Sequence, residues 1–133
     1  MSSDPRDVVI AFCDAFERRS VEGVLAYLAP DVVYQNVPLP AMYGADEAGK
    51  FLIPLLKTAT KIEFEVLAIA SSADWVLTER VDRLHFPSGV VEIPLMGVFV
   101  VRDGKIGEWR DYADCATVAQ AFADAKVDLA PPD

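Results

Sequence analysis

Residues 75–86 read WVLTERVDRLHF, and this stretch decides the fold class of the chain. Side chains alternate along a strand, so Arg80 and Asp82 share one face of it, and that face is apolar at both ends. Similar β-branched and aromatic residues fill three further predicted strands, at 62–70, 90–101 and 105–112. Short turn-like segments join these strands, which predicts antiparallel pairing in a meander.

The residues outside this meander predict helices and one more strand. Asp4 and Pro5 form a helix start, because a capping side chain precedes a proline at the first helical position. Apolar residues at helical spacing predict four helices, over 5–19, 21–29, 45–58 and 114–126. Pro54 is expected to kink or shorten the third of them. Residues 31–37 are expected to form a short strand.

This order of helices and strands predicts an α+β domain. We expect a curved sheet, mixed but mostly antiparallel, which packs on the N-terminal helices and makes a cone with an internal pocket. A chain of 133 residues fits one domain with one core, here residues 1–128. The two prolines near the end predict a loose tail over 129–133.

The composition argues against two classes of partner. The net charge is −9, from 21 acidic and 12 basic residues, so the average surface field repels nucleic acid and anionic membranes. No apolar run reaches the roughly 18 residues of a membrane span, and the first residues lack a signal-peptide pattern. We therefore expect a cytoplasmic protein that binds neither nucleic acid nor membranes.

Few residues are available for metal or nucleophilic chemistry. Cys13 and Cys115 are the only cysteines and have no metal-binding spacing, and His85, the only histidine, is predicted on the outer face of its strand. We expect two reduced thiols, no metal site and no Ser/His/Asp triad. Carboxylates remain as the candidate catalytic groups.

Five polar residues fall on faces that are predicted to point into the pocket: Tyr34, Asn36, Arg80, Asp82 and Asp111. Charges in such an apolar setting are costly unless they are paired, and a guanidinium has enough donors to hold two carboxylates. One arginine with one aspartate would more often be a structural ion pair. The gathering of all five on inward faces favours a functional site instead.

Three short segments carry this cluster: Tyr34-Gln35-Asn36, Arg80-Val81-Asp82 and Trp109-Arg110-Asp111-Tyr112. Their spacing, with the length of the chain and the order of its elements, resembles the limonene-1,2-epoxide hydrolase family. The resemblance covers nearly the whole chain. It implies a cone-shaped NTF2-like (SnoaL-like) fold, a homodimer, and an epoxide hydrolase that needs no cofactor and forms no covalent enzyme ester.

The resemblance also implies a role for each polar residue. Asp111 would be the general base that deprotonates the attacking water, which Tyr34 and Asn36 help to position. Asp82 would be the general acid that protonates the epoxide oxygen, and Arg80 would hydrogen-bond both aspartates. The two carboxyls must then hold opposite protonation states. We expect burial and the contacts of Tyr34 and Asn36 to maintain this difference.

The residues expected to line the pocket are mainly hydrocarbon: Leu55, Leu84, Met96 and Trp109. Such a lining suits a small apolar epoxide, terpene-like or cycloalkene, which would react with water to give a vicinal diol.

Two other functions fit the same fold class. A ketosteroid isomerase or polyketide cyclase would remove a carbon-bound proton with one aspartate and stabilise the enolate with a tyrosine. That chemistry has no use for an arginine between two aspartates. A non-catalytic binder of apolar small molecules would use the polar cluster only as an anchor.

Overall fold

The computed structural model describes residues 3–127, and the predicted tail over 129–133 lies outside them. The elements are α1 (Pro5–Glu17), α2 (Val21–Tyr27), β1 (Leu28–Val37), β2 (Met42–Tyr43), α3 (Ala45–Thr58), β3 (Lys61–Ser72), β4 (Trp75–Phe86), β5 (Gly89–Arg102), β6 (Lys105–Tyr112) and α4 (Cys115–Asp124). The four predicted helices and five predicted strands are confirmed, and β2 is an additional short strand.

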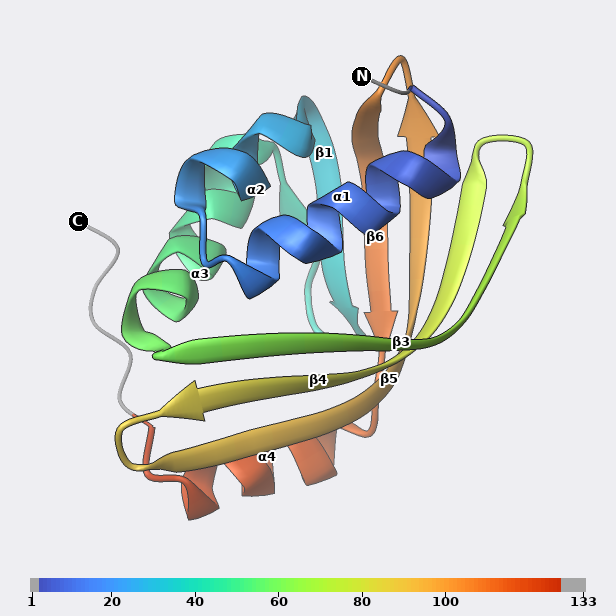
Figure 1. Ribbon diagram of the computed structural model, residues 1–133. Helices are drawn as coiled ribbons and strands as arrows, with labels where there is room; N and C mark the ends of the chain where they lie inside the picture. The colour runs from blue at the N-terminus through green and yellow to red at the C-terminus, as the bar shows by residue number, and fades with distance from the viewer. Residues whose placement is uncertain (1–2, 128–133) are drawn as a thin grey trace.

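The strands form one curved sheet in the order β2-β1-β6-β5-β4-β3. Neighbouring strands are antiparallel except β1 and β6, which run parallel. The sheet is therefore mixed and mostly antiparallel, as predicted. In Figure 1, β3, β4 and β5 pass beneath α1 and then bend upward, so that the sheet curls around the helices. The concave face of the sheet and the helices enclose the core.

Pro30 does not lie where the sequence pattern placed it, and Pro54 does not shorten the helix that was predicted to contain it. β1 begins at Leu28, directly after α2, so Pro30 lies inside a strand rather than at a helix end. Its missing N–H is tolerated because the ladder between β1 and β6 skips from Leu28 to Val33. α3 continues through Pro54. The Lys50 carbonyl loses its helical donor there, but Lys50 is exposed and water can supply one.

Aromatic packing fixes α1 against the concave face of the sheet. Phe12 and Phe16 meet the Trp109 indole of β6 edge-on, with ring centroids 5.1 and 5.8 Å away. Phe99 of β5 stacks on the same indole, 5.8 Å away. All four rings are buried, and Cys13 is buried in the same core as a free thiol, as predicted. Trp109 is therefore held on several sides before any ligand binds.

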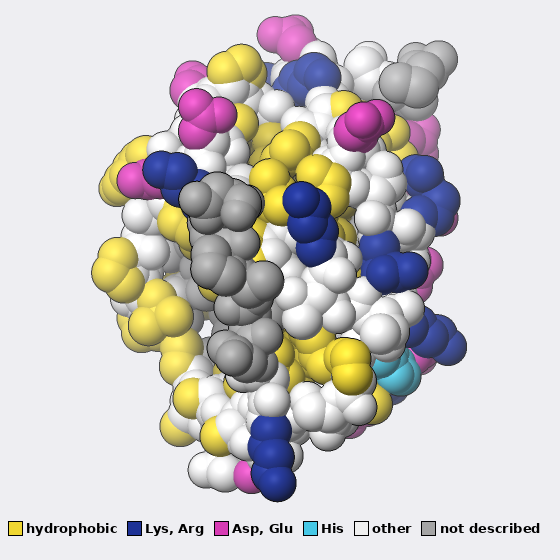
Figure 2. Space-filling view, turned by 90° about the vertical axis from the view of Figure 1, so that its left-hand side faces the viewer, with side chains coloured by type: hydrophobic (Ala, Val, Ile, Leu, Met, Phe, Trp, Pro, Cys, Tyr) yellow, Lys and Arg dark blue, Asp and Glu magenta, His cyan; other side chains and the backbone are white. Residues whose placement is uncertain are grey.

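Charged residues are dispersed on the face of the molecule shown in Figure 2. Lys and Arg side chains lie there among acidic and apolar ones, and several follow one another down the right-hand edge of the view. Within residues 3–127, no helix is both long enough and apolar enough to cross a membrane.

Candidate active site

A cavity of about 700 Å³ lies between the concave face of the sheet and helices α3 and α4. Its exposed surface is mostly apolar, as in most sites for small molecules. Seven of the nine predicted site residues line it: Tyr34, Asn36, Leu55, Asp82, Leu84, Trp109 and Asp111. The structure therefore brings four of the five predicted polar residues and most of the predicted apolar lining together in one cavity, while Arg80 is buried behind its wall.

Met96 is a correction to the predicted lining. It lies on the outer face of β5 and is 46% exposed, whereas its neighbour Leu95 points inward and lines the cavity. Side chains alternate along a strand, so an assignment that is shifted by one residue reverses the face. Leu95 takes the place that the sequence pattern assigned to Met96.

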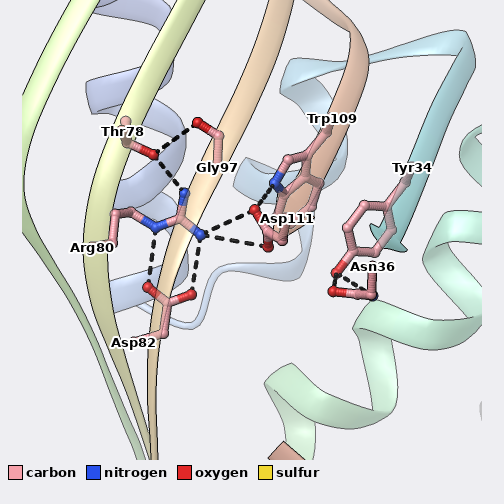
Figure 3. Close-up of polar contacts among 8 residues, drawn as sticks. All are labelled: Tyr34, Asn36, Thr78, Arg80, Asp82, Gly97, Trp109 and Asp111. Carbon is pink, nitrogen blue, oxygen red and sulfur yellow. Dashed lines mark hydrogen bonds and ion pairs between the residues drawn. The ribbon is translucent and has the colours of Figure 1, made fainter. Parts of the chain in front are cut away.

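Arg80 lies between the two aspartates and is fully buried (Figure 3). Its Nε and Nη2 atoms donate to Asp82 Oδ1 and Oδ2, at 3.0 and 3.1 Å. Nη2 also donates to Asp111 Oδ1 and Oδ2, at 3.4 and 3.5 Å. One guanidinium thus bridges two carboxyl groups from β4 and β6, as the sequence predicted. The contact with Asp82 is bidentate and short, and the contact with Asp111 is longer.

The surroundings of Arg80 are apolar on both sides. Its guanidinium carbon lies 5.1 Å from the centre of the Phe64 ring and 5.7 Å from that of Phe99. The rings exclude water and attract the cation through their faces. Burial opposes the charge of Arg80, yet the charges of Asp111 and Asp82 raise its pKa above the ordinary value. Arg80 is therefore a permanent cation in the site.

Burial acts on both carboxyl groups in the same direction. It raises the pKa of Asp82 to about 6, although the Arg80 charge and hydrogen bonds lower it. It also raises the pKa of Asp111, against the lowering effects of the Arg80 charge and of a hydrogen bond from Trp109. Both carboxyls are thus more ready to hold a proton than an aspartate in water. Because they share one cation, we expect them to titrate as a pair.

Trp109 holds Asp111 directly, which the sequence analysis did not predict. The indole Nε1–H donates to Asp111 Oδ1 at 2.8 Å. Tyr34 stacks on the indole, with ring centroids 4.0 Å apart. The expected pocket-lining residue is therefore also a hydrogen-bond donor to the predicted base.

Tyr34 and Asn36 are hydrogen-bonded to each other. The Asn36 amide nitrogen donates to the Tyr34 hydroxyl at 3.2 Å. Within residues 3–127, neither donates to an aspartate, so their contacts do not distinguish the two carboxyls as we had expected. Asn36 is nevertheless the neighbour of Asp111 across the parallel β1 and β6 pair. The amide and the phenol therefore lie beside the predicted base and line the same cavity.

Groups outside this cluster take other positions. His85 lies away from the cavity, and its Nε2 is 2.6 Å from the Glu63 carboxylate on the neighbouring strand. In the part of the chain that the structure describes, no group of three His, Cys, Asp or Glu side chains could hold a metal ion. Thr78 and Gly97, which were not predicted as site residues, contact the Arg80 region from β4 and β5.

The fold and the site together define the class of this protein, an NTF2-like α+β protein with an Asp–Arg–Asp cluster at an apolar cavity. An NTF2-like protein of unknown function from Burkholderia pseudomallei has this fold, with a TM-score of 0.76 at 21% identity. The alignment covers 96% of this chain and 100% of that one. This likeness concerns the fold alone.

Three comparisons identify the family within that class. The model of the limonene-1,2-epoxide hydrolase catalytic domain matches residues 3–124. Epoxide hydrolase EphG of Mycobacterium tuberculosis is 32% identical over 93% of this chain and 83% of its own length. The structure of an M. tuberculosis LEH-like epoxide hydrolase superposes with a TM-score of 0.80 at 30% identity, covering 92% of this chain and 91% of that one. The chain belongs to the limonene-1,2-epoxide hydrolase family and is an LEH-like epoxide hydrolase.

Proposed function

We propose that residues 1–128 act as one catalytic unit that adds water to an apolar epoxide, terpene-like or cycloalkene, and releases a vicinal diol. The reaction proceeds in one step by general acid/base catalysis, without a cofactor or a covalent enzyme ester. The observation that carries this proposal is the bridge from Arg80 to Asp82 and Asp111 at the wall of an apolar cavity.

Charge balance supports the division of labour between the two aspartates. One buried cation can compensate one buried carboxylate, and a second carboxylate at the same place would be unpaired and costly. The raised pKa values of Asp82 and Asp111 allow the pair to keep one proton instead. A pair with one carboxylate and one carboxylic acid supplies the base and the acid that epoxide opening needs.

The proposed reaction assigns the acid to Asp82 and the base to Asp111. Asp111 takes a proton from water while the water oxygen bonds to one epoxide carbon, from the side opposite to the leaving oxygen. The bond from that carbon to the epoxide oxygen breaks, and Asp82 gives this oxygen a proton. Transfer of one proton from Asp111 back to Asp82 restores the resting pair. Catalysis by such positioned acids and bases accounts for about 10²- to 10⁴-fold each.

Tyr34, Asn36 and Trp109 prepare the base for this step. The indole N–H donates to Asp111 Oδ1 at 2.8 Å, whereas Oδ2 receives only the long bond from Arg80 Nη2 at 3.5 Å, so Oδ2 is the oxygen better placed to accept a proton from water. Asn36 and Tyr34 lie beside it and offer an amide and a hydroxyl to hold the water. The enolate chemistry of the isomerases and cyclases needs one aspartate and one tyrosine and does not use an arginine between two aspartates. The geometry therefore favours epoxide hydrolysis.

The first prediction concerns the product and the origin of its oxygen. Limonene oxide and cyclohexene oxide are suitable apolar probes, and at least one of a panel of such epoxides is expected to give its diol. In a single turnover in oxygen-18 water, mass spectrometry should find the label in the diol and none in the protein. Label in the peptide that contains Asp82 or Asp111 would show a covalent ester, and no diol from any epoxide of the panel would refute the proposed function.

We also propose that the protein is a homodimer that associates through the outer face of the sheet. Apolar residues are exposed on this face, among them Leu67, Leu77, Met96 and Tyr112. Several of them line a shallow groove of about 450 Å³. An exposed apolar surface of this kind suits a two-fold interface.

The oligomeric state can be tested with one charge on that face. Size-exclusion chromatography with light scattering is expected to give twice the mass of one chain for the wild type. Met96→Glu should shift the protein toward the monomer, because it places a charge in the interface. Ile10→Glu, a control at an equally exposed apolar residue of α1, should leave the mass unchanged. A wild-type monomer, or equal behaviour of the two variants, would contradict this interface.

A further inference from the structure

β5 passes between Arg80 and Asp111 at Gly97. Gly97 pairs with Thr78 on β4 and with Asp111 on β6, so these three residues form one row across the sheet. Figure 3 shows the Arg80 side chain reaching across this row from β4 to Asp111. A β-carbon at position 97 would overlap Arg80 Nη1 and would lie 2.8 Å from Asp111 Oδ1. The guanidinium thus occupies the space that a side chain on residue 97 would need.

The backbone does not explain why residue 97 is a glycine. Gly44, Gly89 and Gly104 are the glycines with positive φ in residues 3–127, so Gly97 has a backbone conformation that other residues can adopt. A glycine in a strand interior costs stability, and it often marks a place where another group comes close to the backbone. Here the close group is the side chain of Arg80.

Thr78 holds the end of the guanidinium that faces away from the aspartates. Its hydroxyl oxygen accepts a hydrogen bond from Arg80 Nη1 at 2.9 Å, and the hydroxyl donates to the Gly97 carbonyl at 3.2 Å. The second bond turns the hydroxyl so that a lone pair faces the arginine. Thr78 is fully buried, so bulk water cannot take over this contact.

We propose that Thr78 and Gly97 form an arginine socket, which positions the Arg80 guanidinium so that one cation reaches both aspartates. This inference rests on the acid/base mechanism proposed above and adds two positioning residues to it. The socket matters most for Asp111, because the two Arg80 contacts to it, at 3.4 and 3.5 Å, are near the outer limit of hydrogen bonding. Asp82 is less dependent on the socket, since it lies on the same strand as Arg80 and its bonds are shorter.

Loss of the socket should change the titration of Asp111. Within residues 3–127, the charged and titratable groups around Asp111 are Arg80 and Asp82 on β4, Tyr34 on β1 and Cys13 on α1. Arg80 is the only cation among them. If the guanidinium moves away, Asp111 keeps its burial but loses the charge that lowers its pKa, and the pKa rises. The acidic limb of the kcat/KM profile, where the base gains its proton, should then move to higher pH.

Gly97→Ala is the main test, with Gly107→Ala as its control in the same sheet. An alanine at 107 would make only ordinary contacts, at 3.6 Å or more. We expect Gly97→Ala to lower kcat roughly 10- to 100-fold, the range typical of a misplaced catalytic group, with a smaller change in KM. Its acidic limb should move to higher pH, whereas Gly107→Ala should resemble the wild type in both respects.

Thr78→Val and Thr78→Ser test the other half of the socket without adding bulk. Valine keeps the shape and removes the acceptor for Arg80 Nη1, so its kcat should fall and its acidic limb should shift as in Gly97→Ala. Serine keeps the hydroxyl and should restore both. This pair remains informative if Gly97→Ala does not fold. Equal activity of Thr78→Val and Thr78→Ser would overturn the role of the hydroxyl.

A measurement without substrate separates this inference from the proposed function. Carbon-13 NMR of labelled aspartate carboxyls should show a higher pKa for Asp111 in Gly97→Ala and Thr78→Val than in the wild type. An unchanged Asp111 titration in both variants would overturn the socket, whether or not the wild type hydrolyses epoxides. Conversely, a wild type that forms no diol would refute the proposed function while the NMR shift still supported the socket.

Discussion

Asp111→Asn should lower kcat for epoxide hydrolysis by about 10³- to 10⁴-fold, near the upper end of what a general base contributes. Asparagine has nearly the same shape and can still accept the Trp109 hydrogen bond that now reaches Asp111 Oδ1. It cannot take a proton from water at neutral pH. Attack by water on an epoxide carbon then proceeds without a base, although the cavity and the acid at Asp82 remain.

Binding and catalysis can be separated in this variant. The dissociation constant for an apolar vicinal diol, measured by calorimetry, should change little, because the cavity walls are unaltered. Asp114→Asn is a matched control three residues later, at the exposed cap of α4, where asparagine is an equally good capping residue. It should keep full activity. Near wild-type turnover in Asp111→Asn would remove Asp111 from the mechanism.

The inward faces of the strands could be predicted because side chains alternate along a regular strand. Arg80 and Asp82 needed only the pattern within β4, and Tyr34 and Asn36 only that within β1. The meeting of Arg80 with Asp111 could be expected from the short hairpin between β5 and β6, whereas the parallel pairing of β1 with β6, which places Asn36 beside Asp111, was not predicted. Met96 was assigned to the wrong face because one shifted residue reverses the alternation.

The arginine socket depends on the order and register of three strands, which no single segment of the sequence determines. Gly97 matters because β5 lies between β4 and β6 with a register that places it opposite both Thr78 and Asp111. That register follows from the whole sheet and not from the residues around 97. The sequence nevertheless contains an indication of the socket. A glycine in the middle of an apolar strand lowers stability and often marks a place where another group comes close to the backbone. The hydrogen bond from Trp109 to Asp111 depends on side-chain rotation, which residue spacing does not determine.

Arg80→Gln is expected to destabilise the protein by about 3 to 5 kcal/mol near pH 8, as removal of one partner from a buried ion pair usually does. Arg80 is fully buried and is the cation that both Asp82 and Asp111 contact. Glutamine leaves two carboxyl groups in an apolar site without a compensating charge. Urea unfolding followed by circular dichroism measures the loss, and hydrolysis should be lost as well.

The dependence of this loss on pH reveals its cause. The pKa of Asp82 in the folded protein, about 6, already lies above its ordinary value of 3.8, so folding favours the protonated group. That contribution to stability is present at low pH and is lost as the pH rises through the folded pKa. Without Arg80, the pKa values of Asp82 and Asp111 should rise further. The deficit of Arg80→Gln should therefore be large at pH 8 and much smaller at pH 5, where both carboxyls can be neutral.

Arg83→Gln is the control that separates buried charge from charge in general. Arg83 lies on the outer face of the same strand and pairs with Glu65 and Glu92, whose carboxylates are exposed. Solvent screens such pairs, so Arg83→Gln should cost much less stability and show little of the difference between pH 5 and pH 8. If both variants lost the same stability at both pH values, Arg80 would act through packing alone. In that case the charge of Arg80 would not be what keeps one aspartate protonated and the other ionised, as the proposed mechanism requires.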